Sequence, residues 1–103
     1  MKRIAFKMQL KPGCLAEYQK RHDAIWPSLA TLIQKSGISD YDIFCDETTG
    51  TLFGVQYCSG TSSQSLGDNE LVQEWWAYMS DIMETNSDFS PQTTPLTRVF
   101  HLD

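Results

Sequence analysis

The sequence has few basic residues, no long apolar run and none of several short motifs that commonly identify a function. Eight Lys and Arg residues stand against 13 Asp and Glu residues, which gives a net charge of −5 over 103 residues. A chain of this charge repels phosphate groups, so we expect neither a nucleic-acid partner nor an anionic membrane partner. No apolar run approaches the roughly 20 residues that span a bilayer. The motifs GxGxxG, GxxxxGK[ST], HExxH, CxxC and GxSxG are absent, which removes the usual signs of nucleotide, zinc and serine-hydrolase sites.

Residues that bind metals or form disulfides are also scarce. The 3 cysteines, at positions 14, 45 and 58, are odd in number and show no paired spacing. This pattern predicts reduced thiols and a cytoplasmic protein. The chain has 2 histidines, and no carboxylate lies one helical turn from His22. We therefore expect no transition-metal site.

Apolar residues are abundant enough for one core. They make up 41% of the chain, and the length predicts a single domain over residues 1–103. Alternating side chains predict strands over 3–10, 41–46, 52–58 and 96–102, and periods of three and four predict helices over 14–36 and 70–83. Pro27 should kink the first helix or weaken its hydrogen bonds, and Gly37 should cap its end.

The predicted order β-α-β-β-α-β is typical of an α+β, ferredoxin-like fold, in which both helices cover one face of a four-stranded antiparallel sheet. The other face should also be apolar, because Phe53, Val55 and Tyr57 alternate with Leu52 and Cys58. Exposed apolar patches of this size usually bind a partner. We therefore predict a homodimer packed through the open sheet face, which makes a dimeric α/β barrel.

Two polar side chains of the first predicted helix should point inward. Tyr18 and His22 lie four residues apart, on the same side as Leu15 and Leu29. A buried polar group without a partner costs about 1–3 kcal/mol. The polar groups of Tyr18 and His22 therefore need hydrogen-bond partners. These could be the other of the two side chains, a strand side chain, water or a ligand. The pattern alone leaves a structural pair and a functional site equally open.

Aromatic side chains elsewhere favour a ligand with flat apolar faces and hydroxyl groups, such as a sugar. Trp75 and Trp76 project about 100° apart on the second predicted helix, so one of them should lean toward an edge or a cavity. Tyr41 opens the second predicted strand. Each of these residues considered alone has a simpler explanation. The two indoles would anchor the core, and Tyr41 would be a strand-end tyrosine with a solvated hydroxyl.

Together these segments resemble the L-rhamnose mutarotase family. The resemblance is carried by the run YQKRHDAIWPSL at 18–29, by WWAYMSDIM at 75–83 and by NSDFSP at 86–91, and it extends over nearly the whole chain. It implies a dimeric ferredoxin-like fold, no cofactor, and an isomerase that interconverts the α and β anomers of L-rhamnopyranose. It also implies that His22 is the proton donor and that the sugar contacts are Tyr18, Tyr41, Trp75 and Trp76.

The chemistry of mutarotation agrees with these residues. An imidazole with a pKa of about 6.5 both gives and accepts protons near neutral pH. The segment 59–69 departs from the family pattern, so sugar preference would depend on it if it borders the site. Two alternatives stay open, namely a cofactor-free monooxygenase-like enzyme of the same dimeric barrel type and a non-catalytic sugar-binding dimer module.

Overall fold

A computed structural model describes residues 2–103. The elements in chain order are β1 (Lys2–Gln9), α1 (Leu15–Asp23), α2 (Pro27–Lys35), β2 (Ile38–Asp46), β3 (Thr51–Cys58), the short 3₁₀ helix η1 (Ser63–Ser65), α3 (Glu70–Met79) and β4 (Thr94–Leu96).

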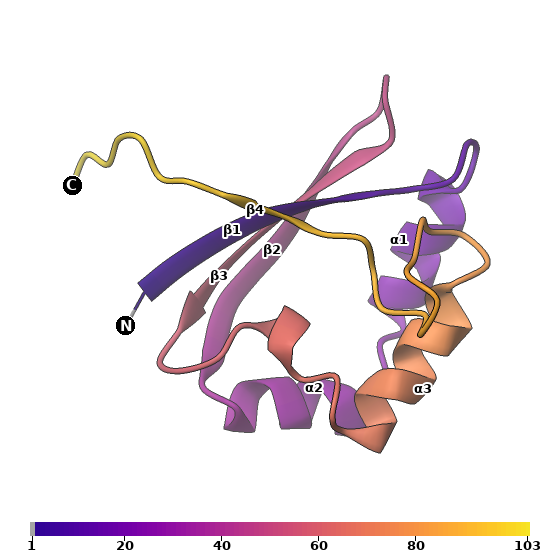
Figure 1. Cartoon of the computed structure of the whole chain (residues 1–103), viewed down its shortest axis with the longest axis horizontal. Coiled ribbons are helices and arrows are strands. Elements are labelled where there is room, and N and C mark those ends of the chain that lie inside the picture. The colour runs from indigo at the N-terminus through magenta and orange to yellow at the C-terminus, as the bar shows by residue number, and fades with distance from the viewer. Residues whose placement is uncertain (1) are drawn as a thin grey trace.

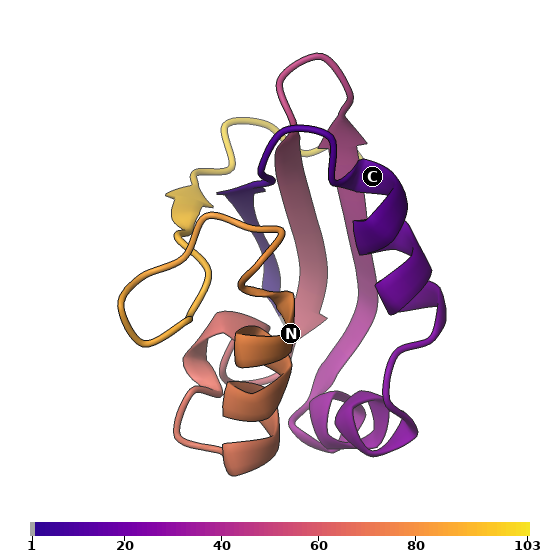
Figure 2. The same ribbon diagram turned by 90° about the vertical axis from the view of Figure 1, so that its right-hand side faces the viewer.

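The four strands form one antiparallel sheet in the order β2-β3-β1-β4. All three α-helices lie on the same face of this sheet, as the two views in Figures 1 and 2 show. The predicted α+β class, the antiparallel sheet and its one-sided helical cover are therefore confirmed. No helix within residues 2–103 is both long enough and apolar enough to cross a membrane.

The predicted helix over 14–36 is two helices, because Pro27 causes a break rather than a kink. Pro27 is the first residue of α2, a position where its missing N–H would have no helical partner in any case. The residue before a proline is driven away from helical geometry, and Trp26 accordingly has an extended conformation with ψ of 125°. Gly37 follows α2 with φ of +87°, the left-handed geometry expected at a helix C-terminus.

Two other predicted elements were too long. The strand predicted over 96–102 is wrong, since β4 covers only Thr94–Leu96, where it pairs with Ala5–Lys7 of β1. The later residues alternate as predicted but pair with no strand among residues 2–103, and Val99, Phe100 and Leu102 are 93%, 76% and 79% exposed. The helix predicted over 70–83 ends at Met79.

A bulge in β2 changes which side chains face the helices. Between its pairs with Tyr57 and Val55 of β3, β2 advances by three residues instead of two. Within this bulge, Asp40 has a left-handed backbone conformation, with φ of +46°. Because side chains alternate along a strand, this extra residue lets Ile38 and Tyr41 both point to the helix-covered face.

The core lies between the helices and the covered face of the sheet. Its buried members are Phe6, Met8, Leu10, Tyr18, Leu29, Leu52, Val72, Trp75, Met79, Ile82 and Met83. The opposite face of the sheet carries the half-buried side chains of Phe53, Val55 and Tyr57, and Phe44 beside them is exposed. The open face is therefore apolar in part, since the exposed side chains of Arg3, Lys7 and Asp42 pair with Tyr57, Phe53 and Val55 on the same face.

Candidate active site

A cavity of about 640 Å³ lies between the helices and the sheet. Its lining includes all five residues singled out from the sequence, which come from three different elements: Tyr18 and His22 of α1, Tyr41 of β2, and Trp75 and Trp76 of α3. The fold thus brings these side chains to one hollow of a size usual for small-molecule sites.

Tyr18 and His22 stack on each other rather than forming a side-chain hydrogen bond. Their ring centroids are 4.3 Å apart, with 27° between the ring planes. The imidazole Nδ1 lies 3.2 Å from the backbone carbonyl oxygen of Tyr18. A carbonyl oxygen only accepts, so this hydrogen bond assigns the proton of the neutral imidazole to Nδ1. Nε2 therefore keeps a free lone pair and is able to accept a proton.

Burial sets the charge of these groups. It lowers the pKa of His22, while the hydrogen bond to the Tyr18 carbonyl and the charge of Asp23 oppose this effect. Burial raises the pKa of both Tyr18 and Tyr41. At neutral pH the cavity therefore contains an uncharged imidazole and two protonated phenols, which suits a neutral ligand that exchanges protons.

The paired indoles have different surroundings. Trp75 is buried and meets the His22 ring edge-on, with centroids 5.4 Å apart. Trp26, which the sequence pattern placed on the same helix as His22, lies beyond the end of α1 and packs against Trp75 with centroids 5.0 Å apart. Trp76 is half-buried. Trp75 thus packs into the wall of the cavity and Trp76 lies nearer its edge, in agreement with the expectation that only one indole is fully in the core.

The segment 59–69 borders the cavity through Ser63, Gln64 and Leu66. It is fixed by Gln56, a fully buried side chain of β3. The Gln56 amide accepts from the backbone N–H of Ser63 and donates to its hydroxyl, each over 2.8 Å. The segment 59–69 is therefore part of the cavity lining, and the sequence alone gave no sign of the buried glutamine that holds it.

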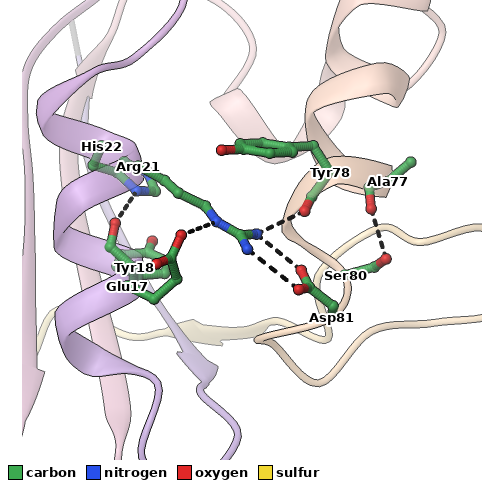
Figure 3. A network of polar contacts seen from close by, with 8 residues as sticks. All are labelled: Glu17, Tyr18, Arg21, His22, Ala77, Tyr78, Ser80 and Asp81. Carbon is green, nitrogen blue, oxygen red and sulfur yellow. Dashed lines mark hydrogen bonds and ion pairs between the residues drawn. The ribbon is translucent and has the colours of Figure 1, made fainter.

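Arg21 is a second residue that the sequence analysis missed. Its guanidinium group spans from α1 to the end of α3, where it donates to a carboxylate oxygen of Asp81 and to the carbonyl oxygen of Tyr78, each over 2.8 Å (Figure 3). It also donates to Glu17 within α1 over 2.7 Å. The four-residue spacing from Glu17 is visible in the sequence, but the pairing with Asp81, 60 residues away, is not.

The other candidate residues lie elsewhere or form no cluster. His101 is in the exposed tail and pairs with Asp103 over 2.7 Å. The 3 cysteines are free, and of these Cys45 lines the cavity. Within residues 2–103, no three His, Cys, Asp or Glu side chains gather closely enough to hold a metal ion.

Fold and site together define a class: a small α+β protein with a four-stranded antiparallel sheet and a cavity lined by aromatic side chains. The sequence model of the L-rhamnose mutarotase family matches residues 3–102. The chain therefore belongs to the L-rhamnose mutarotase family, as the resemblance predicted.

Individual relatives agree along the whole length. An L-rhamnose mutarotase from Bacteroides thetaiotaomicron is 58% identical over 104 residues, with 100% of both chains covered. One from Jannaschia sp. is 55% identical over 103 residues, with 99% of both chains covered. A crystal structure of L-rhamnose mutarotase from Formosa agariphila has a TM-score of 0.94 to this chain at 46% identity, and the match covers 100% of both chains.

Proposed function

We propose that this chain is an isomerase that interconverts the α and β anomers of L-rhamnopyranose without a cofactor. The observation that carries the proposal is the neutral imidazole of His22, which lies among phenols and indoles in the cavity of a chain from this family. The reaction needs a base and an acid at one hemiacetal centre, and one imidazole is able to supply both.

The proposed reaction is balanced within one imidazole. Nε2 of His22 takes the proton of the anomeric hydroxyl as the bond between C1 and the ring oxygen breaks. The imidazolium then gives this proton to the ring oxygen, which leaves an open-chain aldehyde. After rotation about the C1–C2 bond, the same nitrogen takes the proton back and delivers it to the carbonyl oxygen as the ring closes. Tyr18 orients the imidazole or the sugar.

Replacing His22 tests this assignment. In His22→Ala we expect anomer exchange, measured by saturation-transfer NMR, to fall by about 10²–10⁴-fold, the usual contribution of a positioned acid/base group. Sugar binding should survive as ligand-dependent thermal stabilisation. Lys20→Ala, at an exposed position of the same helix, is the control. Full exchange in a folded His22→Ala protein would contradict the proposal.

The same experiments separate the alternatives. A sugar-binding module without catalytic activity would show stabilisation by sugar but no acceleration of anomer exchange by the native chain. A monooxygenase-like enzyme would instead turn over a quinol or a haem, seen as a change in absorbance, and would leave the anomer ratio to relax at its uncatalysed rate.

We propose that Tyr18, Tyr41, Trp75 and Trp76 contact the sugar. Their common place in the cavity lining supports this. Trp76→Phe and Tyr41→Phe should each raise KM more than they lower kcat, because they remove binding contacts and leave the imidazole in place. An unchanged KM in both variants would contradict the assignment.

The wider arrangement is also a proposal. We infer that residues 1–103 form one ferredoxin-like domain and that the protein is cytoplasmic. The strand order, the single buried cluster and the family match over residues 3–102 support the domain, and the free cysteines are in keeping with a reducing compartment.

We propose further that two copies pair through their open sheet faces to form a dimeric α/β barrel. The apolar face around Val55 and the exposed apolar tail at Val99–Leu102 support this, because an apolar surface of this kind favours burial against a second copy. Val55→Glu should shift the mass measured by sedimentation from dimer to monomer. Lys20→Glu, on the exposed side of α1, should not. A native chain that is monomeric at all concentrations would contradict the proposal.

A further inference from the structure

The helix that carries the catalytic candidate is weakly anchored by apolar contacts. α1 has 9 residues, of which Tyr18 alone is buried. Its first turn has no side-chain cap, and its last residue is followed directly by the non-helical linker to α2. Helices shorter than about 12 residues are marginal without tertiary support. Other contacts must therefore fix the position of α1.

Arg21 supplies contacts of this kind. Its guanidinium Nη1 and Nη2 donate to the two carboxylate oxygens of Asp81, over 2.8 Å and 3.2 Å, and Nη1 also donates to the backbone of Tyr78. A two-point contact with a carboxylate fixes orientation as well as distance. Figure 3 shows the Arg21 side chain extending from α1 toward Tyr78 and Asp81, with His22 next to it on α1.

The contact between Arg21 and Asp81, called the bridge from here on, is connected to the imidazole of His22 by aromatic contacts. The guanidinium carbon of Arg21 lies 4.5 Å from the centre of the Tyr78 ring. Tyr78 in turn packs on Trp75 with centroids 5.6 Å apart, and Trp75 meets His22 at 5.4 Å. Contacts thus run from Arg21 through α3 and back to the residue that follows Arg21 in the chain.

We infer that Arg21 is a positioning residue, which together with Asp81 holds α1 against α3 and so keeps the His22 imidazole in place beside Trp75. This inference rests on the proposed role of His22 in anomer exchange. Neither Arg21 nor Asp81 lines the cavity, so they act through His22 rather than on the sugar.

The magnitudes separate this role from a general stabilising one. The Arg21 side chain is 11% exposed, but its partners Asp81 and Glu17 are 66% and 43% exposed, and ion pairs with a partner open to solvent contribute modestly to the stability of a whole domain. A small displacement of a catalytic group, by contrast, lowers the rate by about 100-fold. Loss of the bridge should therefore reduce activity far more than stability.

The first test compares three variants by anomer-exchange NMR and thermal unfolding. Asp81→Ala and Arg21→Gln should lower kcat by about 10- to 100-fold with a smaller change in KM and little change in Tm. Glu17→Gln is the matched control, because Glu17 also binds Arg21 but lies on α1 itself and does not reach α3. It should keep kcat close to the native value. Arg21→Lys, which keeps the charge, should recover part of the loss.

The second test follows the His22 pKa by NMR in the same proteins. A looser α1 exposes the imidazole to water, so in both Asp81→Ala and Arg21→Gln its pKa should rise toward the ordinary value. A purely electrostatic effect would differ in sign, since Asp81→Ala removes a negative charge and Arg21→Gln removes a positive one. The charged group that acts on the imidazole from its own helix is Asp23, which is unchanged in both variants.

The outcomes are distinct. Native kcat in Asp81→Ala and Arg21→Gln, or His22 pKa shifts of opposite sign, would overturn the positioning role. Absence of anomer exchange in the native chain would instead overturn the proposed function, and the pKa comparison would still decide whether the bridge holds His22 in place.

Discussion

The two helical walls of the cavity are held in different ways. α3 buries Val72, Trp75 and Met79, whereas α1 buries only Tyr18. α3 also begins with a side-chain cap, in which Asn69 accepts from the backbone N–H of Leu71 over 2.8 Å. α1 relies instead on polar contacts and aromatic stacking.

This difference places the proposed chemistry on the less anchored wall. Regions of a protein differ in local stability, and functional elements are often drawn from the less stable ones. Substitutions of the buried aliphatic residues of α3 should therefore change mainly the free energy of unfolding, and substitutions that loosen α1 should change mainly the activity. The following predictions test that division.

The largest expected effect is on the stability of the α3 wall. Met79→Ala removes a buried side chain from the core and should lower the free energy of unfolding by about 2–5 kcal/mol. Urea titration measures this change. Glu74→Ala, at an exposed position of the same helix, is the control and should differ from the native chain by less than about 0.5 kcal/mol. Equal effects of the two substitutions would show that α3 is not anchored by its apolar side.

A smaller effect is expected where the segment 59–69 meets α3. A Cβ atom on Gly67 would lie 2.9 Å from Cζ3 of Trp76, which is too close for undisturbed packing. Gly67→Ala should therefore displace the indole and cost about 1–3 kcal/mol of stability. Gly60→Ala is the matched control, because a Cβ atom there would meet nothing within 4 Å.

Measuring KM in the same two glycine variants separates packing from sugar binding. If Trp76 contacts the sugar, Gly67→Ala should also raise KM, whereas Gly60→Ala should not. A destabilised Gly67→Ala protein with native KM would show that the position of Trp76 matters for packing alone.

Much of this arrangement was predictable because it depends on local periodicity. Alternation located the first three strands, and the four-residue spacing of Tyr18 and His22 put both rings on one side of a helix. The order of elements then defined the sheet and its uncovered face. Each of these inferences uses residues close together in the chain, where side-chain direction follows from backbone geometry.

What the sequence could not predict depends on pairing between distant residues. The bulge at Asp40 shifts the alternation by one residue, so that Ile38 and Tyr41 face the same side, but this shift becomes clear only from the pairing of β2 with β3. The contact of Arg21 with Asp81 exists only once α1 and α3 lie side by side. The residues beyond Leu96 alternate like a strand, yet a strand also needs a neighbour, and the described part of the chain pairs none with them.

The smallest expected effect concerns pH and the α1 wall. Burial lowers the pKa of His22, so the imidazole should stay neutral, and kcat should stay constant, until the pH falls below the ordinary value of 6.5. The unfolded chain binds a proton at about 6.5 and the folded chain only at a lower pH, so between these values the unfolded state holds more protons. Stability should therefore decrease as the pH falls through this window.

Urea titrations and kcat measurements from about pH 4.5 to about pH 7.5 test both statements. In His22→Ala the loss of stability across this window should shrink, because the group whose pKa burial lowers has been removed. The contact between Arg21 and Asp81 should persist across this pH range, because its hydrogen bond with Arg21 lowers the pKa of Asp81 and keeps the carboxylate charged. Changes in kcat within the range should therefore come from His22. A fall of kcat that begins above pH 6.5 would mean that the imidazole is not held in a buried setting, and that α1 is even less anchored than its contacts indicate.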